Sequence, residues 1–378
     1  MQRTIRIRLQ PSPAQSAALG ETSRQYTAAF NLFAELGWRS SVSNATKLHY
    51  LAYYPVRTAL PALNSNLVNT ARAQAAEALK SAVSLRTDPP RTVSQPRSTA
   101  CPPWYNQHTY RIDWESQTVR LSLVGGRQTL RFSVPPYAVR YAGNPADTAD
   151  VIERNGVWWL HVVVTVPGPE IEPTDQVVGV DLGLAQPAVG SNHRFDGKQA
   201  WKAIEGRLFK HKRALQKQGT KSAKRRLKKL RRKQARFRRD GDHALSKQIV
   251  QSVEPGATMV VENLTTIRKR ATAKKKTAPQ RRLHAWSFAQ LKTFLAYKAE
   301  ERGCTAGVVD PRHTSQTCRC CGHTARNNRR SRAVFRCRAC GYDRAEPAAS
   351  HATFVAVVRR GSQRLQPCAV DAQKETLR

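Results

Sequence analysis

Acidic residues are scarce in this sequence. Its 378 residues include 26 Asp and Glu against 64 Lys and Arg, and the formal net charge is +38 at pH 7. A folded chain with such an excess of one sign repels itself, and a polyanion relieves that repulsion. The usual polyanion is nucleic acid, whose phosphates bind Lys and Arg and release counterions. The composition therefore predicts a nucleic-acid partner, with a membrane surface as the rival.

Long hydrophobic runs are also missing. The longest apolar run, Val157–Val166, is far shorter than the roughly 20 residues that span a bilayer. The N-terminus, Met1–Arg8, alternates charged and β-branched residues and has no apolar core of signal-peptide length. These absences exclude a membrane-spanning protein and argue against a membrane partner. We therefore expect a cytoplasmic chain.

The eight cysteines lack the spacing of a disulfide scaffold. Four of them form two CxxC pairs separated by fifteen residues, and Gly follows the second cysteine of each pair. Such pairs let four thiolates reach one tetrahedral Zn²⁺, and a four-cysteine site leaves no open position for catalysis. The alternatives are free buried cysteines, or a change of register that uses Cys320. The spacing predicts a structural zinc ribbon whose ligands are Cys318, Cys321, Cys337 and Cys340.

The first half of the chain predicts a β domain with a helical insertion. Residues 3–9 alternate as a strand does, Pro11 and Pro13 open a helical stretch with apolar residues to Phe33, and a second helical stretch is expected from about Leu67 to Leu85. A proline-rich loop follows at 86–103, and short alternating runs at 110–166 indicate a small antiparallel barrel or sandwich. The strand at residues 3–9 is expected to join that sheet. With 40% hydrophobic residues, the chain has enough core for two or three domains.

The second half predicts an α/β domain after a linker at 167–173. Buried strands are expected at 177–183 and 257–264, and an amphipathic helix at 283–302. Between the strands, residues 207–239 form a helical segment in which 17 of 33 residues are Lys or Arg. So many like charges would repel one another without a polyanion nearby. We therefore expect this segment to contact nucleic acid.

Two carboxylates end the two buried strands. Asp181 and Glu262, placed side by side in a sheet, could share Mg²⁺, which prefers a few carboxylate oxygens together with water and phosphate. Paired metal ions would activate water for phosphodiester cleavage. The alternatives are a helix cap or turn, and the phosphate-binding turn of an actin-like ATPase, which also follows a strand ending in Asp-x-Gly.

Several motifs together resemble the TnpB/OrfB proteins of insertion sequences, which are relatives of type V CRISPR effectors. Residues 178–184 are similar to the first RuvC motif and residues 260–264 to the second. The basic segment, the approach to the ribbon at 310–318 and the cysteine pairs follow the family's order. The resemblance is specific over residues 176–352 and looser over residues 1–167.

The resemblance implies an α+β multidomain fold. An N-terminal wedge β-barrel would carry a helical insertion, and a RuvC/RNase H-like α/β domain would carry an inserted zinc ribbon. The implied divisions are a first barrel strand at 1–10, a helical recognition region at 11–95, the wedge barrel at 96–168, the RuvC-like domain at 176–302, the ribbon at 303–344, the end of the RuvC-like domain at 345–358 and a flexible tail at 359–378.

The resemblance also implies a function. A guide RNA would pair with target DNA while the protein holds the heteroduplex backbone, so guide RNA and target DNA are the expected partners. Zn²⁺ would be structural, and Mg²⁺ would serve a RuvC-type endonuclease. The residues expected to contact nucleic acid are Lys221, Lys224, Arg225, Arg226, Lys228, Lys229, Arg231, Arg232 and Lys233.

The sequence departs from the family at the third RuvC motif. The family's motif, Asp-Arg-Asp-x-Asn-Ala-Ala, supplies a third carboxylate, but here Ala345 occupies that position and Pro347 replaces the Asn. A methyl group cannot bind Mg²⁺, so we expect cleavage to be impaired. Glu346 or Asp343 could substitute and keep the endonuclease active. Glu346 is one residue out of register, which is a rotation of about 100° on a helix.

The hypotheses therefore span several classes. An RNA-guided DNA binder with impaired cleavage could act as a repressor or be a decaying transposon remnant. An active RNA-guided endonuclease and an RNA-independent zinc-ribbon DNA-binding protein are the alternatives. An actin-like ATPase would need a second glycine-rich phosphate loop, and the sequence has none. The oligomeric state cannot be read from the sequence.

Overall fold

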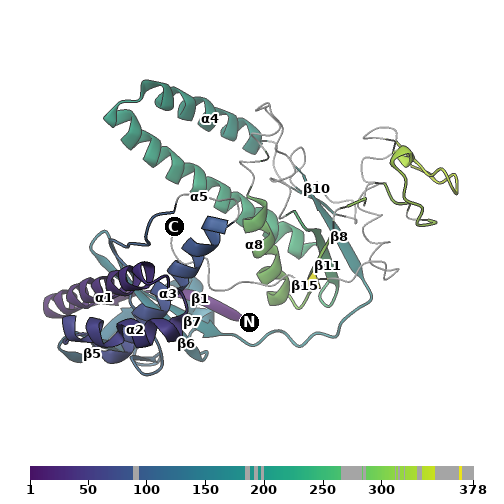
Figure 1. Ribbon diagram of the computed structural model, residues 1–378. Helices are drawn as coiled ribbons and strands as arrows, with labels where there is room; N and C mark the ends of the chain where they lie inside the picture. Colours follow the sequence, from purple (N-terminus) through teal and green to yellow (C-terminus); the bar gives the residue numbers. More distant parts are fainter. Residues whose placement is uncertain are drawn as a thin grey trace. The chain divides into compact units, whose positions relative to one another are not determined.

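The computed structural model describes residues 1–87, 93–183, 188–190, 195–196, 200–264, 283, 287–310, 312–313, 316–318, 320–329, 334–344 and 366–367. The chain folds into two compact units, Met1–Pro167 and Gly168–Arg378 (Figure 1). The division falls at the start of the proline-containing linker expected from the sequence. No helix in the described part of either unit has the length and apolar character needed to cross a membrane.

The first unit contains a seven-stranded antiparallel sheet with the order β2-β6-β7-β1-β5-β4-β3. The N-terminal strand β1 lies inside it, because it pairs with β5 on one side and β7 on the other. The alternation of Ile5, Ile7 and Leu9 buries one face of β1. The strands are β1 (Gln2–Gln10), β2 (Trp104–Tyr105), β3 (Tyr110–Asp113), β4 (Thr118–Leu123), β5 (Gly126–Ser133), β6 (Ala146–Arg154) and β7 (Val157–Thr165), and a 3-10 turn, η1 (Pro136–Tyr141), lies between β5 and β6.

Three helices are inserted between β1 and the rest of this sheet: α1 (Pro13–Arg39), α2 (Ala45–Ala59) and α3 (Ser65–Thr87). A capping box starts α1, in which the Ser12 hydroxyl accepts from the Gln15 backbone N–H and the Gln15 side chain accepts from the Ser12 N–H. The sequence predicted α1 and α3 but not α2. Only Leu48, Ala52 and Val56 are buried in α2, so it has a narrow apolar stripe, and Pro55 lies within it.

The second unit contains a six-stranded mixed sheet with the order β10-β9-β8-β11-β12-β15. Its three central strands β8, β11 and β12 are parallel, so their carboxyl ends meet at one edge. The flanking strands β9 and β15 run antiparallel to β8 and β12. The strands are β8 (Val177–Leu182), β9 (Ala188–Gly190), β10 (Phe195–Asp196), β11 (Thr258–Glu262), β12 (Thr305–Val309) and β15 (Gln366–Pro367).

The basic segment is a helical hairpin rather than one helix. Helix α4 (Ala200–Gln218) ends before Gly219, which has φ +63°, and α5 (Lys221–Gln251) starts after Thr220. The Thr220 hydroxyl caps α5 by accepting from the Ala223 N–H at 3.1 Å. The segment expected to be helical over 207–239 thus consists of two helices, because the Gly-Thr pair is both a helix end and a helix start.

Helices α5 and α8 (Phe288–Glu301) pack on one face of the second sheet (Figure 1). Alternate strand residues such as Val180, Val261 and Val308 form a core with Ile249 of α5 and Leu291 of α8. The tail expected at 359–378 is not wholly separate from the fold, because β15 pairs with β12. The expected end of the RuvC-like domain at 345–358 lies outside the described residues.

Candidate functional site

The two CxxC pairs converge. The ligand atoms of Cys318, Cys321, Cys337 and Cys340 all lie within 4.8 Å of one another. The Sγ atoms of Cys318 and Cys340 are 3.7 Å apart, and those of Cys321 and Cys337 are 3.5 Å apart. Four sulfurs around Zn²⁺ at about 2.3 Å form a tetrahedron with edges of about 3.8 Å. The quartet therefore fits a tetrathiolate zinc site.

Two matching turns aim the thiols. The Gly322 N–H donates to the Cys318 carbonyl at 2.9 Å, and the Gly341 N–H donates to the Cys337 carbonyl at 3.1 Å. Both glycines have positive φ, +77° and +70°, a conformation that a side chain would strain. Burial raises the pKa of the Cys337 thiol, but the N–H groups of Cys340 and Ala339 lower it to about 6. A thiol with a lowered pKa gives the thiolate that a metal needs.

A buried amide that sequence reasoning missed ties the two turns together. Asn328 is 0% exposed, and its Nδ2 donates to the carbonyls of Gln316 and His323 at 3.0 and 3.1 Å. Its Oδ1 accepts from the Arg338 N–H, between the second pair of cysteines, at 3.0 Å. Asn328 ends a short 3-10 turn, η2 (Arg326–Asn328). An Asn in a ribbon loop has no spacing signal that would have revealed this role.

The spare cysteine stays outside the quartet. Cys320 is exposed, and its backbone N–H donates to the Cys318 sulfur at 3.4 Å. The ribbon continues as a two-stranded hairpin, β13 (Phe335–Arg336) and β14 (Asp343–Arg344), in which Arg336 pairs with Asp343. Cys320 therefore supports a ligand through its main chain while its side chain faces solvent.

Asp181 and Glu262 lie on neighbouring parallel strands. The register pairs Val180 of β8 with Val261 of β11, so the next residues, Asp181 and Glu262, lie at the same level. Strands in a sheet are about 4.8 Å apart. By strand alternation, both side chains lie on the face opposite that packed against α5 and α8. The two carboxylates thus share one edge and one face of the sheet.

A third ligand does not accompany this pair in the described part of the chain. Among the described residues, the cysteine quartet is the group of three or more His, Cys, Asp or Glu side chains that converges. Ala345 and Glu346 lie outside the described residues. Asp343 is exposed and belongs to β14 of the ribbon hairpin.

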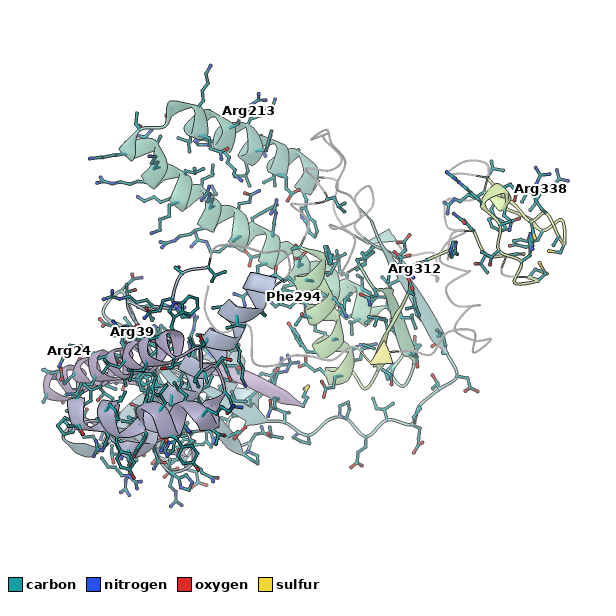
Figure 2. The ribbon with its side chains drawn as sticks, viewed as in Figure 1. Arg24, Arg39, Arg213, Phe294, Arg312 and Arg338 are labelled. Carbon is teal, nitrogen blue, oxygen red and sulfur yellow. The ribbon has the colours of Figure 1, made fainter. Side chains whose placement is uncertain are left out.

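The basic face of α5 is open to solvent. Nine cations lie in the first half of this helix, and residues 221–239 contain no acidic residue. All nine are exposed: Lys221, Lys224, Arg225, Arg226, Lys228, Lys229, Arg231, Arg232 and Lys233. Figure 2 shows long side chains that project from both helices of the hairpin, with Arg213 on α4. Such a surface attracts phosphate backbones without reading bases.

An ion pair joins the two helices of the hairpin: Arg238 Nε of α5 donates to the Glu205 carboxylate of α4 at 2.8 Å. The backbone of α5 also comes close to α4 at Gly241, where an added Cβ would lie 3.5 Å from the Trp201 ring. Deeper in the unit, the Lys298 ammonium of α8 donates to the His243 carbonyl and the Ser246 hydroxyl at 2.6 and 2.7 Å. The cationic half of α5 therefore extends from a helix whose other half is anchored in the core.

Comparison with protein families gives two matches in chain order. A family described as a probable transposase, OrfB_IS605, matches residues 161–272, which include β8, the hairpin and β11. A family described as Cas12f1-like, TNB domain, matches residues 288–349, which include α8, β12 and the ribbon. Together they cover most of the elements that carry the site.

Curated relatives match about half of the chain. Over 213 residues it is 30% identical to the CRISPR-associated endodeoxyribonuclease Cas12f1 of Syntrophomonas palmitatica, which is 50% of this chain and 41% of that protein. It is 30% identical to Cas12f1 of Sulfoacidibacillus thermotolerans over 210 residues, 50% and 48% of the two chains. It is 28% identical to a putative RNA-guided DNA endonuclease, InsQ, of Escherichia coli K12 over 213 residues, 51% and 52%. The matches thus span about half the length of these relatives.

The fold extends the likeness beyond that half. A Cas12f1 chain solved with guide RNA and target DNA superposes with a TM-score of 0.60, at 15% identity, over 89% of this chain and 81% of that chain. At this identity the likeness shows the fold alone. The two family matches, in chain order around a converged cysteine quartet, support a protein of the TnpB/OrfB family.

Proposed function

We propose that this chain is an RNA-guided DNA-binding protein of the TnpB type whose capacity to cleave DNA is impaired. The observation that carries the proposal is the pairing of β8 with β11. It puts Asp181 beside Glu262 on the unit that also carries the exposed cations of α5. The candidate metal site and the cationic surface thus belong to one structural unit. The sequence lacks the family's third acidic residue at position 345.

The names of the curated relatives support guide RNA and target DNA as the partners of this chain. Their names describe a CRISPR-associated endodeoxyribonuclease and an RNA-guided DNA endonuclease. The matches span about half of each relative, and we propose that this chain shares their RNA-guided recognition of DNA. Guide RNA would choose the target by base pairing, and the protein would hold the backbone of the heteroduplex.

The exposed cations of α5 suit that backbone role. Phosphates lie regularly along a duplex, and a helix that presents Lys and Arg without acidic neighbours can neutralise several of them. The anchored half of α5, held through His243 and Ser246 by Lys298, keeps this surface in a fixed relation to the sheet. Affinity would depend strongly on salt and weakly on sequence.

Mg²⁺ would bind between Asp181 and Glu262, at the carboxyl ends of β8 and β11. When bound, Mg²⁺ supplies an activated water and stabilises the leaving oxygen of a phosphodiester. Asp181 and Glu262 would hold it from adjacent strands, and the alanine at position 345 offers no ligand atom. Two carboxylates in place of three weaken metal affinity and position the attacking water less well. We infer that DNA binding survives and that cleavage does not.

The cysteine quartet would hold structural Zn²⁺. Its four thiols fill a tetrahedron, so no coordination position is left for substrate. Glu346 and Asp343 are the residues through which an active endonuclease would have to replace the third carboxylate. Asp343 already belongs to β14, where it pairs with Arg336, so its backbone is fixed within the ribbon.

Restoring the missing carboxylate tests the proposal directly. The full-length chain would be purified with the RNA it carries, and that RNA would be sequenced to define a matching target. In Mg²⁺ the wild-type complex should retain target DNA on a filter without cutting it. The Ala345→Asp, Pro347→Asn variant should gain cleavage, and adding Asp181→Ala should abolish the gain. Since Asp181→Ala controls for contaminating nuclease, the gain can be assigned to this edge.

Three results would contradict the proposal in different ways. Cutting by the wild-type complex that is lost in Glu346→Gln would show that Glu346 replaces the third ligand. Target binding that persists unchanged after RNase treatment would indicate an RNA-independent DNA-binding protein. A purified chain without bound transcript, indifferent to added RNA, would remove the RNA-guided function altogether.

A further inference from the structure

The linker between the two units is held by the second unit along most of its length. The Thr174 N–H donates to the Gly256 carbonyl at 3.0 Å, and the Gln176 carbonyl accepts from the Thr258 N–H at 2.9 Å. These two bonds continue the pairing of β8 with β11 backwards, ahead of the first residue of β8. We call residues 171–176 the strap. Its main chain is therefore fixed to the second sheet before β8 begins.

Two glycines of the second unit allow the strap to lie this close. Gly256 and Gly303 both have positive φ, +83° and +75°, and the Gly256 N–H donates to the Gly303 carbonyl at 3.1 Å. A Cβ at Gly256 would overlap the Glu172 carbonyl oxygen, and a Cβ at Gly303 would overlap the Ile171 side chain. Only glycine combines that backbone conformation with so close an approach. The strap is thus a part of the second unit, although it reads as linker in the sequence.

The first unit holds the chain as far as Val166. The Thr165 N–H donates to the Pro145 carbonyl at 2.9 Å, and the Val166 N–H donates to the Met1 carbonyl at 2.8 Å. The Val166 side chain also packs against the core of the first unit. Four residues, Pro167–Glu170, then separate this fixed end from the strap. All four are exposed, and within the described part of the chain they make no hydrogen bond or ion pair.

Gly168 has the most conformational freedom of these four residues. The rings of Pro167 and Pro169 fix φ at about −65°. Glu170 carries a Cβ, which makes positive φ unfavourable. Gly168 can adopt φ of either sign, and a Cβ added to it would meet no atom within 4 Å. A rotation of the backbone between the two units therefore costs least at Gly168.

Charge gives the two units no reason to adhere. The first unit has 18 Lys and Arg against 9 Asp and Glu, and the second has 46 against 17. Their formal net charges are thus +9 and +29, so the two units repel each other. Repulsion of this kind opposes a fixed interface, and it leaves the connecting residues to determine which orientations are accessible.

We propose that Pro167–Glu170 is the hinge between the two units, that Gly168 is its pivot, and that the strap moves with the second unit as one rigid body. Four residues span at most about 14 Å, so the hinge permits rotation but little separation. A polyanion bound to one unit would then stay within short reach of the other, at a high effective concentration. The inference concerns the mechanics of the chain and does not depend on RNA guidance.

Distances between spin labels in the two units test the pivot. Nitroxides would be attached through non-canonical amino acids at the exposed positions Glu77 of α3 and Gln251 of α5, in the full-length chain after RNase treatment. Pulsed electron resonance should give a broad distance distribution. Gly168→Pro should narrow its width at least twofold, because three consecutive prolines form a stiff extended helix. Gly168→Ala should narrow it less, and Gly206→Ala, at an equally open position in α4, should not change it. Equal widths in wild type and Gly168→Pro would overturn the pivot.

Two matched insertions separate the hinge from the strap. A Gly-Ser pair inserted after Gly168 should broaden the distance distribution and leave the thermal unfolding of the second unit unchanged. The same pair inserted between Glu172 and Pro173 should lower that unfolding temperature, because it displaces Thr174 from Gly256 or Ile171 from Gly303. If both insertions had the same effect, the whole linker would be flexible and the strap would not exist.

Hydrogen exchange of the unmodified chain gives a second test that needs no variant. Relative to its rate in an unstructured peptide, the Thr174 N–H should exchange at least tenfold more slowly, because it is bonded to the Gly256 carbonyl. The N–H groups of Gly168 and Glu170 should exchange at close to their unstructured rates. Protection of Gly168 equal to that of Thr174 would mean that the linker is rigid throughout, and would overturn the hinge.

Discussion

The hydroxyl of Ser287 donates a hydrogen bond to the buried carboxylate of Asp242, which joins the start of α8 to the second half of α5. Ser287 occupies the cap position of α8, yet its side chain makes no capping bond there. Its hydroxyl binds the Asp242 carboxylate instead. Burial raises the pKa of Asp242 from its ordinary value near 3.8 to about 6, although Ser287 and Arg238 act to lower it. At pH 7 this carboxylate is therefore charged, although its burial favours the neutral form.

A pH-dependent loss of stability follows from Asp242. Between about pH 4 and 6 the folded chain binds more protons at this group than the unfolded chain, so its contribution to stability falls as pH rises through that range. Asp242→Asn keeps an acceptor for Ser287 and should raise stability at pH 7 by roughly 1–3 kcal/mol. Near pH 4 the two proteins should be alike. Thermal unfolding across this pH range measures the difference.

The exposed neighbour Asp240 provides the control for that measurement. Asp240→Asn removes one negative charge from the same turn of α5 without changing a buried group. It should leave the pH dependence of unfolding close to that of the wild type. If Asp242→Asn and Asp240→Asn had the same effect, the cause would be the net charge of the helix, and burial of Asp242 would have no part in it.

The cations of α5 should determine how binding responds to salt. Lys228→Gln, Lys229→Gln and Arg232→Gln together remove three exposed charges. If each contacts a phosphate, the slope of log K against log salt for duplex should fall by about 2.7, because each contact contributes about 0.9. Lys247→Gln, on the anchored half of the same helix, should change the slope little. Fluorescence anisotropy at several salt concentrations gives both slopes, and equal slopes would place the phosphate contacts elsewhere.

The zinc ligands can be separated from the spare cysteine by metal content. Purified wild-type chain should hold one Zn²⁺, Cys320→Ser should retain it, and Cys321→Ser should lose it, because Cys321 belongs to the converged quartet. Asn328→Ala should keep the metal but release it faster to a chelator. That change leaves the Arg338 N–H and two carbonyls without their buried partner, at a cost of roughly 1–3 kcal/mol. Zinc retained in Cys321→Ser and lost in Cys320→Ser would show the other register.

Local patterns in the sequence predicted the elements that depend on near neighbours. The alternation of Ile5, Ile7 and Leu9 is a property of one strand, and it is present in β1. The two CxxC pairs are short turns, so their spacing alone predicted which thiols converge. The cations of the basic segment predicted an exposed helical surface, since no core could hold them. Each of these inferences needed only a few consecutive residues.

Features that depend on distant residues were not predictable in the same way. Asp181 and Glu262 lie side by side only because of the register between β8 and β11, two strands that are separated by some 75 residues of chain. The buried face of α2 exists because α1 and α3 cover it, and its outer tyrosines obscured the helical pattern. The role of Asn328 depends on two loops that meet only when the ribbon folds. The break at Gly219 divides the predicted helical segment into α4 and α5, and composition alone did not locate it.

Gly303 should be hard to replace because the linker packs directly on it. Gly303 has φ +75°, and a methyl group there would lie 2.5 Å from Cδ1 of Ile171, a residue of the linker. Gly303→Ala should destabilise the fold by about 1–2 kcal/mol for the positive φ, with a further cost for the overlap. Ile171→Ala should remove the overlap with Cδ1 and Cγ1, leaving Cβ at 3.2 Å, but should not relieve the backbone strain. A double-mutant cycle in denaturant should therefore give a favourable coupling of roughly 0.5–1 kcal/mol.

Gly256, which also contacts the linker, and Gly206, an unobstructed position within α4, provide the comparisons for Gly303. At Gly256, with φ +83°, a methyl group would lie 2.4 Å from the Glu172 carbonyl oxygen, so the backbone itself would have to move. Gly256→Ala should therefore cost more than Gly303→Ala, and Ile171→Ala should relieve less of its cost. Gly206→Ala, at an open position within α4, should instead stabilise the chain by up to about 1 kcal/mol. If Gly256→Ala and Gly303→Ala lowered the free energy of unfolding equally, the linker residues Ile171 and Glu172 would not pack on these two glycines in solution.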